Sequence, residues 1–172
     1  MKEHYLHLYY GNGKGKTTAA AGLCLRSLGA GSKVLFCQFL KDGSSSEIAP
    51  LQSLGAEILA SPPAKFIWHM IPEEKKSYLE AQHRLFCEAV QKAQSGRYEI
   101  AVLDEALDAL QQGAFTEQEL IYAVKSAKCE LVLTGRAPTQ QLLILSDYAT
   151  EMTSIKHPYG TEQLSARKGI EF

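Results

Sequence analysis

A glycine-rich loop near the N-terminus is the feature that most constrains what this chain can fold into. The sequence GNGKGKTT at 11–18 follows a β-prone segment at 5–9 and precedes an Ala- and Leu-rich segment at 16–28. This order of strand, loop and helix is typical of a phosphate-binding loop, whose glycines let backbone N–H groups converge on phosphate oxygens at the helix N-terminus. Within it, Lys16 supplies a positive charge and the Thr17 hydroxyl can ligate Mg²⁺. The sequence therefore predicts a site for a phosphate-bearing ligand.

The loop departs from the usual phosphate-loop pattern at one position. In G-x-x-x-x-G-K-[ST] the first glycine would fall at position 10, which is Tyr10. The glycines stand at 11, 13 and 15 instead. The Gly-Lys-Thr run that carries the charge and the metal ligand is intact, so the predicted chemistry is unchanged.

The rest of the chain alternates between strand-like and helix-like segments. Strands are expected at 5–9, 33–40, 56–59, 98–103, 130–133 and 149–155. Helices are expected at 16–28, 72–94, 116–127 and 138–145. The continuous apolar run KVLFCQFL at 33–40 is typical of a strand buried on both faces. We therefore expect one domain over residues 1–172, an α/β fold with a doubly wound, mainly parallel sheet in three layers, of the RecA-like P-loop class.

Composition places the chain among ordinary globular proteins. Its 172 residues are 45% hydrophobic, and 18 Lys and Arg against 19 Asp and Glu give a net charge of −1. This balance does not support a general nucleic-acid binder, and no apolar run approaches the roughly 18 residues of a membrane span. The N-terminus shows no secretory signal pattern.

The four cysteines form no Cys-x-x-Cys motif, and each lies in an apolar stretch. We therefore expect four buried, reduced thiols in a cytoplasmic protein: Cys24, Cys37, Cys87 and Cys129.

Polar residues follow two of the predicted strands. Asp104 and Glu105 end an apolar strand, the usual position of a carboxylate that binds Mg²⁺ directly or through water near a phosphate loop. The alternative is a solvated acidic pair that opens a helix. Arg136 follows the strand at 130–133 and is interpreted either as a phosphate contact or as part of a structural salt bridge.

Two aromatic residues lie in a segment bounded by prolines. Phe66 and Trp68 stand between Pro62-Pro63 and Pro72, where a regular core element is not expected. In an extended segment their i, i+2 spacing would point both rings the same way, an arrangement that suits a flat, apolar ligand. Taken alone, these two residues are better explained by an ordinary core contact.

Together these motifs resemble the ATP:corrinoid adenosyltransferases of the P-loop, cobalamin-pathway type. The resemblance covers nearly the whole chain in family order: GNGKGKTTAAAG at 11–22, QFLK at 38–41, FIW at 66–68, VLDEALDALQQG at 102–113, LVLTGRAP at 131–138 and a tail with TEM, KHPY and GIEF at 150–172. The tail signature combined with GNGKGKTT is specific to this group among P-loop proteins.

The resemblance implies a reaction. The Co(I) of a corrinoid, either cob(I)alamin or cob(I)yrinic acid a,c-diamide, attacks the 5′ carbon of ATP, and inorganic triphosphate leaves as one unit. The product is the adenosylcorrinoid needed in adenosylcobalamin synthesis or salvage. The phosphate loop would then stabilise the leaving group. The resemblance also implies Mg²⁺ or Mn²⁺ as cofactor, reduced flavodoxin or flavin as electron donor, and a homodimer.

The family's residue roles carry over by position. Lys16, Thr17 and Glu105 would be catalytic, and the metal ligands would be Thr17, Glu105 and Asp104. Phe66 and Trp68 would lie below the corrin and displace its lower axial ligand, and Lys41 and Glu47 would be further corrinoid contacts. The residues that would contact ATP and its phosphates are Gly11, Asn12, Gly13, Lys14, Gly15, Lys16, Thr17, Thr18 and Arg136.

Two departures from the family and two alternatives remain. Family members often carry an N-terminal helical extension that helps cover the site, whereas this sequence starts at the first strand, so we expect any lid to come from elsewhere. The loop after QFLK lacks the family's Trp and Gly-Glu and keeps Glu47 as the remaining acid.

Two alternative functions stand beside the adenosyltransferase. One is a P-loop kinase or NTPase with a small-molecule acceptor, and the other is a non-catalytic carrier of corrinoid or nucleotide.

Overall fold

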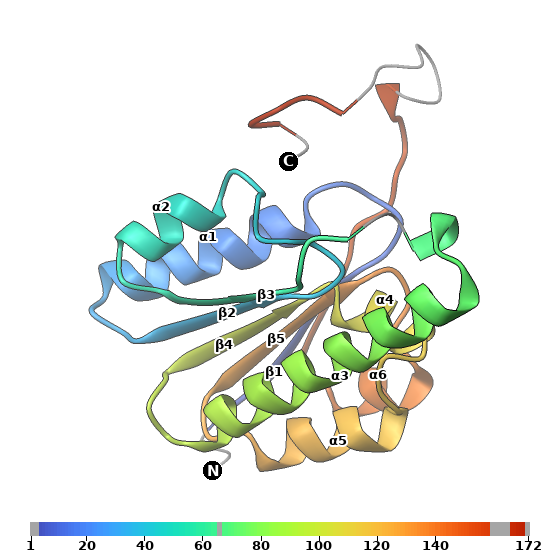
Figure 1. The fold of residues 1–172 in the computed structure, drawn as a ribbon. Helices are drawn as coiled ribbons and strands as arrows, with labels where there is room; N and C mark the ends of the chain where they lie inside the picture. The colour runs from blue at the N-terminus through green and yellow to red at the C-terminus, as the bar shows by residue number, and fades with distance from the viewer. Residues whose placement is uncertain (1–3, 65–66, 159–165, 171–172) are drawn as a thin grey trace.

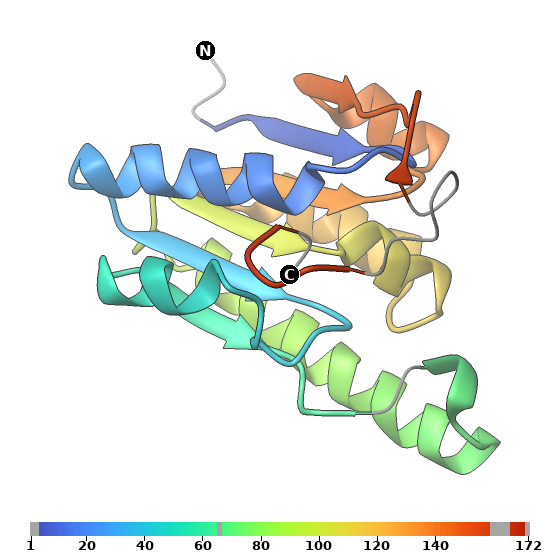
Figure 2. The same ribbon diagram turned by 90° about the horizontal axis from the view of Figure 1, so that it is seen from above.

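The protein is a three-layer α/β structure built on a six-stranded, wholly parallel sheet with strand order β3-β2-β4-β5-β1-β6 (Figures 1 and 2). The structure is a computed structural model that describes residues 4–64, 67–158 and 166–170. The strands are β1 (Leu6–Tyr10), β2 (Val34–Gln38), β3 (Glu57–Ala60), β4 (Ile100–Asp104), β5 (Glu130–Gly135) and β6 (Tyr148–Glu151). The helices are α1 (Lys16–Gly29), α2 (Ile48–Ser53), α3 (Pro72–Gln94), α4 (Ala106–Gln111), α5 (Glu117–Ser126) and α6 (Gln140–Leu145), with a 3₁₀ turn η1 (Ile67–His69).

Alternating strand residues face two separate cores. On one face, Val34, Phe36 and Val102 pack against α1 and α2. On the other, Leu35 and Leu103 pack against α3, α4 and α5. The central strands β2 and β4 are buried at every position, which is why their sequences are continuously apolar rather than alternating. The doubly wound α/β class predicted from the sequence is confirmed.

The topology brings the chemistry-bearing loops to one edge of the sheet. All strands run the same way, so the loops that follow β1, β2, β4 and β5 emerge at the same, carboxyl edge. β5 lies between β1 and β4, with Tyr10 beside Gly135 and Leu103 beside Leu133 in register. Gln38 of β2 is paired with Asp104 of β4. The phosphate loop and the acidic pair therefore face each other across the end of β5.

Several boundaries differ from those predicted. α2 and α4 have six residues each, too short for helical periodicity to show, and neither was predicted. The last strand ends at Glu151 rather than at residue 155. β2 ends at Gln38 rather than at residue 40, because Leu40 has a left-handed backbone with φ 56°.

The prediction of four buried thiols is wrong for Cys87, which is exposed. The buried stripe of α3 runs through Gln82, Phe86, Ala89 and Ala93, and Cys87 lies one position off that stripe, about 100° around the helix. The other three thiols are buried, and burial raises the pKa of Cys24 and of Cys129 to about 12.

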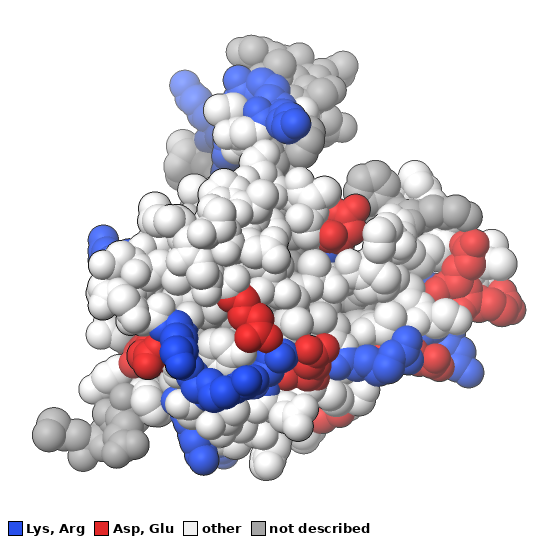
Figure 3. Space-filling model, turned by 60° about the vertical axis from the view of Figure 1, so that its left-hand side comes forward, with Lys and Arg blue, Asp and Glu red and all other residues white. Residues whose placement is uncertain are grey.

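Charged side chains of both signs share the surface. On the face drawn in Figure 3, Lys and Arg side chains lie next to Asp and Glu side chains in a band across the lower half of the view. In the described ranges, no helix combines the length and the apolar character needed to cross a bilayer.

A capping box at the start of α5 gives a test of the fold. The Glu119 carboxylate accepts hydrogen bonds from His83 Nε2 at 2.8 Å and from the Thr116 backbone N–H at 2.7 Å, which joins α5 to α3. These hydrogen bonds lower the pKa of Glu119 to about 2. We expect Glu119→Gln to lower the free energy of unfolding near neutral pH by about 0.5–1 kcal/mol, because the pair is largely exposed.

The pH dependence of that loss checks its cause. The Glu119 pKa is depressed in the folded protein, so its stabilisation is present above the ordinary value of 4.5 and is lost as pH falls toward about 2. Urea unfolding at a series of pH values should show the difference between wild type and variant shrinking over that window. A difference that does not change with pH would contradict the assignment. Glu117→Gln, a carboxylate in the same turn, is the control.

Candidate functional site

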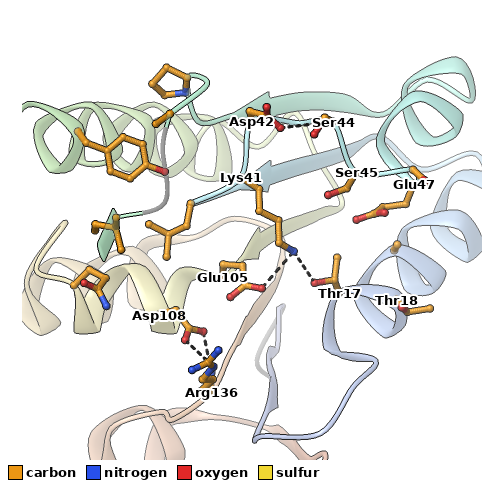
Figure 4. Close-up of a pocket in the computed structure, with 18 of the residues that line it drawn as sticks. Thr17, Thr18, Lys41, Asp42, Ser44, Ser45, Glu47, Glu105, Asp108 and Arg136 are labelled. Carbon is orange, nitrogen blue, oxygen red and sulfur yellow. Dashed lines mark hydrogen bonds and ion pairs between the residues drawn. The ribbon is translucent and has the colours of Figure 1, made fainter. Parts of the chain in front are cut away.

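A cavity of about 870 Å³ opens at the carboxyl edge of the sheet (Figure 4). It is lined by side chains that the sequence singled out, from the start of α1, the loop after β2, the turn η1 and the residues that follow β4 and β5: Thr17, Thr18, Lys41, Glu47, Trp68, Glu105 and Arg136. Gly169 and Ile170 of the tail also reach it. Segments far apart in the sequence are therefore brought to one place.

The phosphate loop is held from two sides by backbone hydrogen bonds. Its Gly11 N–H donates to the carbonyl of Arg136 at 2.9 Å, and its Gly13 N–H donates to the carbonyl of Met152 at 2.6 Å. The Lys16 ammonium lies over the loop and donates to the carbonyls of Gly11 and Gly13, both at 2.8 Å. The residue before α1, Gly15, takes a left-handed backbone with φ 112°. The loop thus has the strand, turn and helix context that the sequence predicted.

The segment that follows β6 crosses the phosphate loop and explains its unusual glycines. A Cβ added at Gly11 would lie 2.4 Å from the carbonyl oxygen of Met152, and one at Gly13 would lie 2.7 Å from the same atom. The Ser154 N–H donates to Asn12 Oδ1 at 2.9 Å. Tyr10, which stands where the usual pattern has glycine, belongs to β1, and its carbonyl accepts from the Met152 N–H at 2.7 Å. The strand predicted to run to residue 155 instead ends early and supplies this crossing segment.

Asp104 is the most enclosed acid of the site. It is fully buried, and Oδ1 accepts from the hydroxyls of Thr17 at 2.9 Å and Thr134 at 2.7 Å. Oδ2 accepts from Gln38 Nε2 at 3.1 Å and from Lys41 Nζ at 3.2 Å. Four donors therefore satisfy a carboxylate that would otherwise be costly to bury.

Glu105 extends from Asp104 into the cavity on a strained backbone. Its φ of 60° is left-handed, a conformation that non-glycine residues rarely adopt. The Thr134 hydroxyl holds it by accepting from the Glu105 N–H at 2.9 Å. Burial raises the pKa of Glu105, with Asp104 and Asp108 adding to the rise and Lys41 opposing it. Glu105 precedes α4 and lines the cavity, whereas Asp104 is the last residue of β4 and accepts from Thr17 at the start of α1.

These residues fit a hydrated Mg²⁺. The described part of the chain holds no group of three or more His, Cys, Asp or Glu side chains of the kind that binds a metal unaided. The available ligands are the Thr17 hydroxyl and the carboxylates of Asp104 and Glu105. These are hard oxygen ligands, which Mg²⁺ takes together with water and phosphate oxygens. Beside them, Gln38 Oε1 is buried and has no hydrogen-bond partner among the described residues. An orphaned acceptor next to Asp104 suits a water molecule of a hydrated cation.

Arg136 lies at the rim of the cavity against α4. Its backbone N–H donates to Asp108 Oδ2 at 3.0 Å, and its Nε lies 3.7 Å from Asp108 Oδ1 (Figure 4). The side chain is 79% exposed. The structure therefore shows the salt bridge that the sequence left as one of two interpretations, in a position that still leaves the guanidinium beside the cavity.

The aromatic segment differs from the extended form expected for it. Trp68 lies in the 3₁₀ turn η1, so the expectation of an extended segment is wrong there; short 3₁₀ turns are common connectors. Its ring is 72% exposed and lines the cavity together with Ile67, Pro62 and Leu40. Phe66 lies outside the described residues, so the direction of its ring relative to Trp68 stays a prediction.

Four residues that sequence reasoning did not single out complete the site: Gln38, Asp108, Thr134 and Met152. Two of them had a signal, because Gln38 and Thr134 are polar residues at the ends of apolar, buried strands. Asp108 stands four residues after Asp104, one helical turn beyond the acidic pair. Met152 acts through its backbone, which no side-chain pattern reveals.

Comparison with known proteins decides the family. The family described as ATP:corrinoid adenosyltransferase BtuR/CobO/CobP matches residues 2–172. The chain belongs to this family. A corrinoid adenosyltransferase of Pseudomonas aeruginosa is 30% identical over 173 residues, covering 97% of this chain and 83% of that protein. One of Escherichia coli K12 is 27% identical over 171 residues, covering 96% and 84%.

This chain is also similar to a longer protein. An uncharacterized protein of Nostoc sp. is 32% identical over an alignment of 181 residues that covers 96% of this chain and 47% of that protein. The chain therefore spans about half the length of the Nostoc protein and more than four fifths of the two adenosyltransferases.

The close approach of Met152 to the phosphate loop gives a test of the site. We expect Gly13→Ala to push residues 152 and 153 off the loop, because the new Cβ would lie 2.7 Å from backbone atoms that have no flexible end to move. ATP affinity, measured by calorimetry, should fall by about tenfold or more. Gly22→Ala is the matched control, since a Cβ there meets nothing within 4 Å. Equal ATP affinity in both variants would contradict the role of the crossing segment.

Proposed function

We propose that this chain transfers the 5′-deoxyadenosyl group of ATP to the Co(I) of a corrinoid and releases triphosphate. The observation that carries the proposal is that one cavity joins two chemically different sides. Thr17, Glu105 and Arg136 form a polar side beside the phosphate loop, and Leu40 and Trp68 belong to an apolar side. A nucleotide triphosphate suits the first side and a large, flat macrocycle suits the second.

The bond changes require a stabilised leaving group. The electron pair of Co(I) forms the cobalt–carbon bond, the C5′–O bond breaks, and that electron pair leaves on the triphosphate. No phosphoryl group is transferred. In this proposal, Lys16, N–H groups of the loop and Arg136 would oppose the negative charge that grows on the triphosphate, an effect worth on the order of several kcal/mol for a preorganised site. Bound at Thr17, Asp104 and Glu105, Mg²⁺ would supply further positive charge.

The apolar side of the cavity would favour the reduction of the corrinoid cobalt. Trp68 presents an exposed ring toward the cavity, and Phe66 is its proposed neighbour below the corrin. An apolar floor would displace the lower axial ligand and exclude water, which makes Co(II) easier to reduce to Co(I). Glu47 is the residue before α2 and lines the cavity. It is a proposed contact for polar groups on the corrin rim.

Finer features of the activity are proposed on the same basis. Cob(I)alamin and cob(I)yrinic acid a,c-diamide are both proposed substrates. Mg²⁺ or Mn²⁺ is the proposed cofactor, and a reduced flavodoxin or flavin the proposed electron donor. We also propose a cytoplasmic homodimer.

The proposal is tested by an anaerobic assay with ATP, Mg²⁺ and chemically reduced cob(I)alamin. We expect the spectrum of light-sensitive adenosylcobalamin to appear together with one equivalent of intact triphosphate. Lys16→Ala should slow the reaction by about 100-fold or more, because it removes charge stabilisation from the leaving group. ADP or orthophosphate in place of triphosphate would contradict the proposal, as would near-normal activity of the variant.

Trp68 should affect cobalt reduction more than alkyl transfer. We expect Trp68→Ala to slow adenosylation about tenfold more when cob(II)alamin is reduced in the site than when cob(I)alamin is supplied, a difference of about 1.4 kcal/mol. Tyr122→Ala is the control, since this exposed aromatic residue lies on α5 and outside the cavity lining. Equal losses in the two assays would exclude a role in displacing the axial ligand.

A further inference from the structure

The ammonium of Lys41 lies among the oxygen atoms that would bind the metal. Its Nζ is 3.3 Å from Glu105 Oε1 and 3.3 Å from Thr17 Oγ1 (Figure 4). The same Nζ is 3.2 Å from Asp104 Oδ2. These three side chains are the ligands proposed above for Mg²⁺. The Lys41 ammonium therefore occupies the position that a bound divalent cation would take.

The backbone fixes Lys41 in this position. The left-handed turn at Leu40, with φ 56°, redirects the chain after β2 and sends the Lys41 side chain back toward β4. The Leu40 N–H donates to Oε1 of the buried Gln82 at 3.1 Å, and the Ser61 N–H donates to the Lys41 carbonyl at 3.1 Å. Ser61 Oγ donates to the same Gln82 oxygen at 2.9 Å. A buried polar network therefore holds both sides of the residue.

The electrostatics favour an ammonium here. The Asp104 side chain has no exposure, that of Glu105 is 25% exposed, and that of Lys41 is 33% exposed. Charges this close and this shielded interact much more strongly than surface pairs in water. A divalent cation at the same oxygens would lie within a few ångströms of the ammonium and be repelled by it.

We propose that Lys41 is the resident counter-ion of the metal site, which a divalent cation must displace in order to bind. The inference deepens the proposed function, on which it rests for the identity of the ligands. Because the backbone of Lys41 is pinned, the displaced ammonium stays in the cavity, where the triphosphate of ATP would give it a new partner. The Lys41 ammonium thereby opposes the binding of free metal, so that metal and nucleotide bind together.

The test uses Mn²⁺ alone, followed by electron paramagnetic resonance, with the full chain and no corrinoid. We expect Lys41→Met to bind free Mn²⁺ about tenfold more tightly than wild type, because a like charge is removed from the site. Lys41→Arg keeps the charge and should bind as weakly as wild type. Lys92→Met is the matched control, since Lys92 pairs with Glu57 at 2.7 Å at the start of β3, at the opposite edge of the sheet.

A second measurement follows the coupling to nucleotide. In wild type, a non-reactive ATP analogue should tighten Mn²⁺ binding, and in Lys41→Met that tightening should be smaller. The proposal is overturned if Lys41→Met binds Mn²⁺ no more tightly than wild type, or if Lys41→Arg behaves like Lys41→Met. A changed KM for corrinoid with unchanged Mn²⁺ affinity would instead assign Lys41 to the corrin. Because these titrations need no turnover, their outcome is independent of whether the chain catalyses adenosyl transfer.

Discussion

The burial of Asp104 is the constraint on which the rest of the site depends. A carboxylate without solvent exposure must be matched by hydrogen bonds or positive charge, and here the donors come from α1, β2, the loop after β2 and β5. Losing one of these donors would leave a buried charge partly unsatisfied. The same atoms therefore tie the phosphate loop to three neighbouring segments, and the acidic pair is held in place before any ligand arrives.

A second constraint is the close contact between the phosphate loop and the segment that follows β6. The segment after β6 passes so close to the phosphate loop that only glycine fits at positions 11 and 13. The variant spacing of the loop and the course of the chain after β6 are thus one structural feature. This feature fixes the glycine-rich loop beside the cavity at the carboxyl edge of the sheet.

Much of the fold followed from local patterns, and the exceptions have physical reasons. Continuous apolar runs identified β2 and β4 because both faces of these strands are buried, and the glycine loop located the start of α1. The direction of the Lys41 side chain could not be predicted, because it depends on a left-handed turn at Leu40 and on a hydrogen bond from Leu40 to Gln82, which is distant in sequence. Residues that act through the backbone, such as Met152, carry no side-chain signature. For Trp68, the sequence predicts an extended segment and the family resemblance implies a corrin contact, whereas the structure puts the residue in a 3₁₀ turn that lines the cavity.

The central claim is that the phosphate loop holds a leaving triphosphate and that the C5′–O bond of ATP is the bond that breaks. The most direct measurement uses ATP labelled with ¹⁸O at the oxygen bridging C5′ and the α-phosphorus, incubated anaerobically with the protein, Mg²⁺ and cob(I)alamin. Mass spectrometry then locates the label. The account predicts that all of the label appears in inorganic triphosphate and none in the adenosyl product. Label retained on a nucleoside phosphate such as ADP would show phosphoryl transfer instead and would contradict the account.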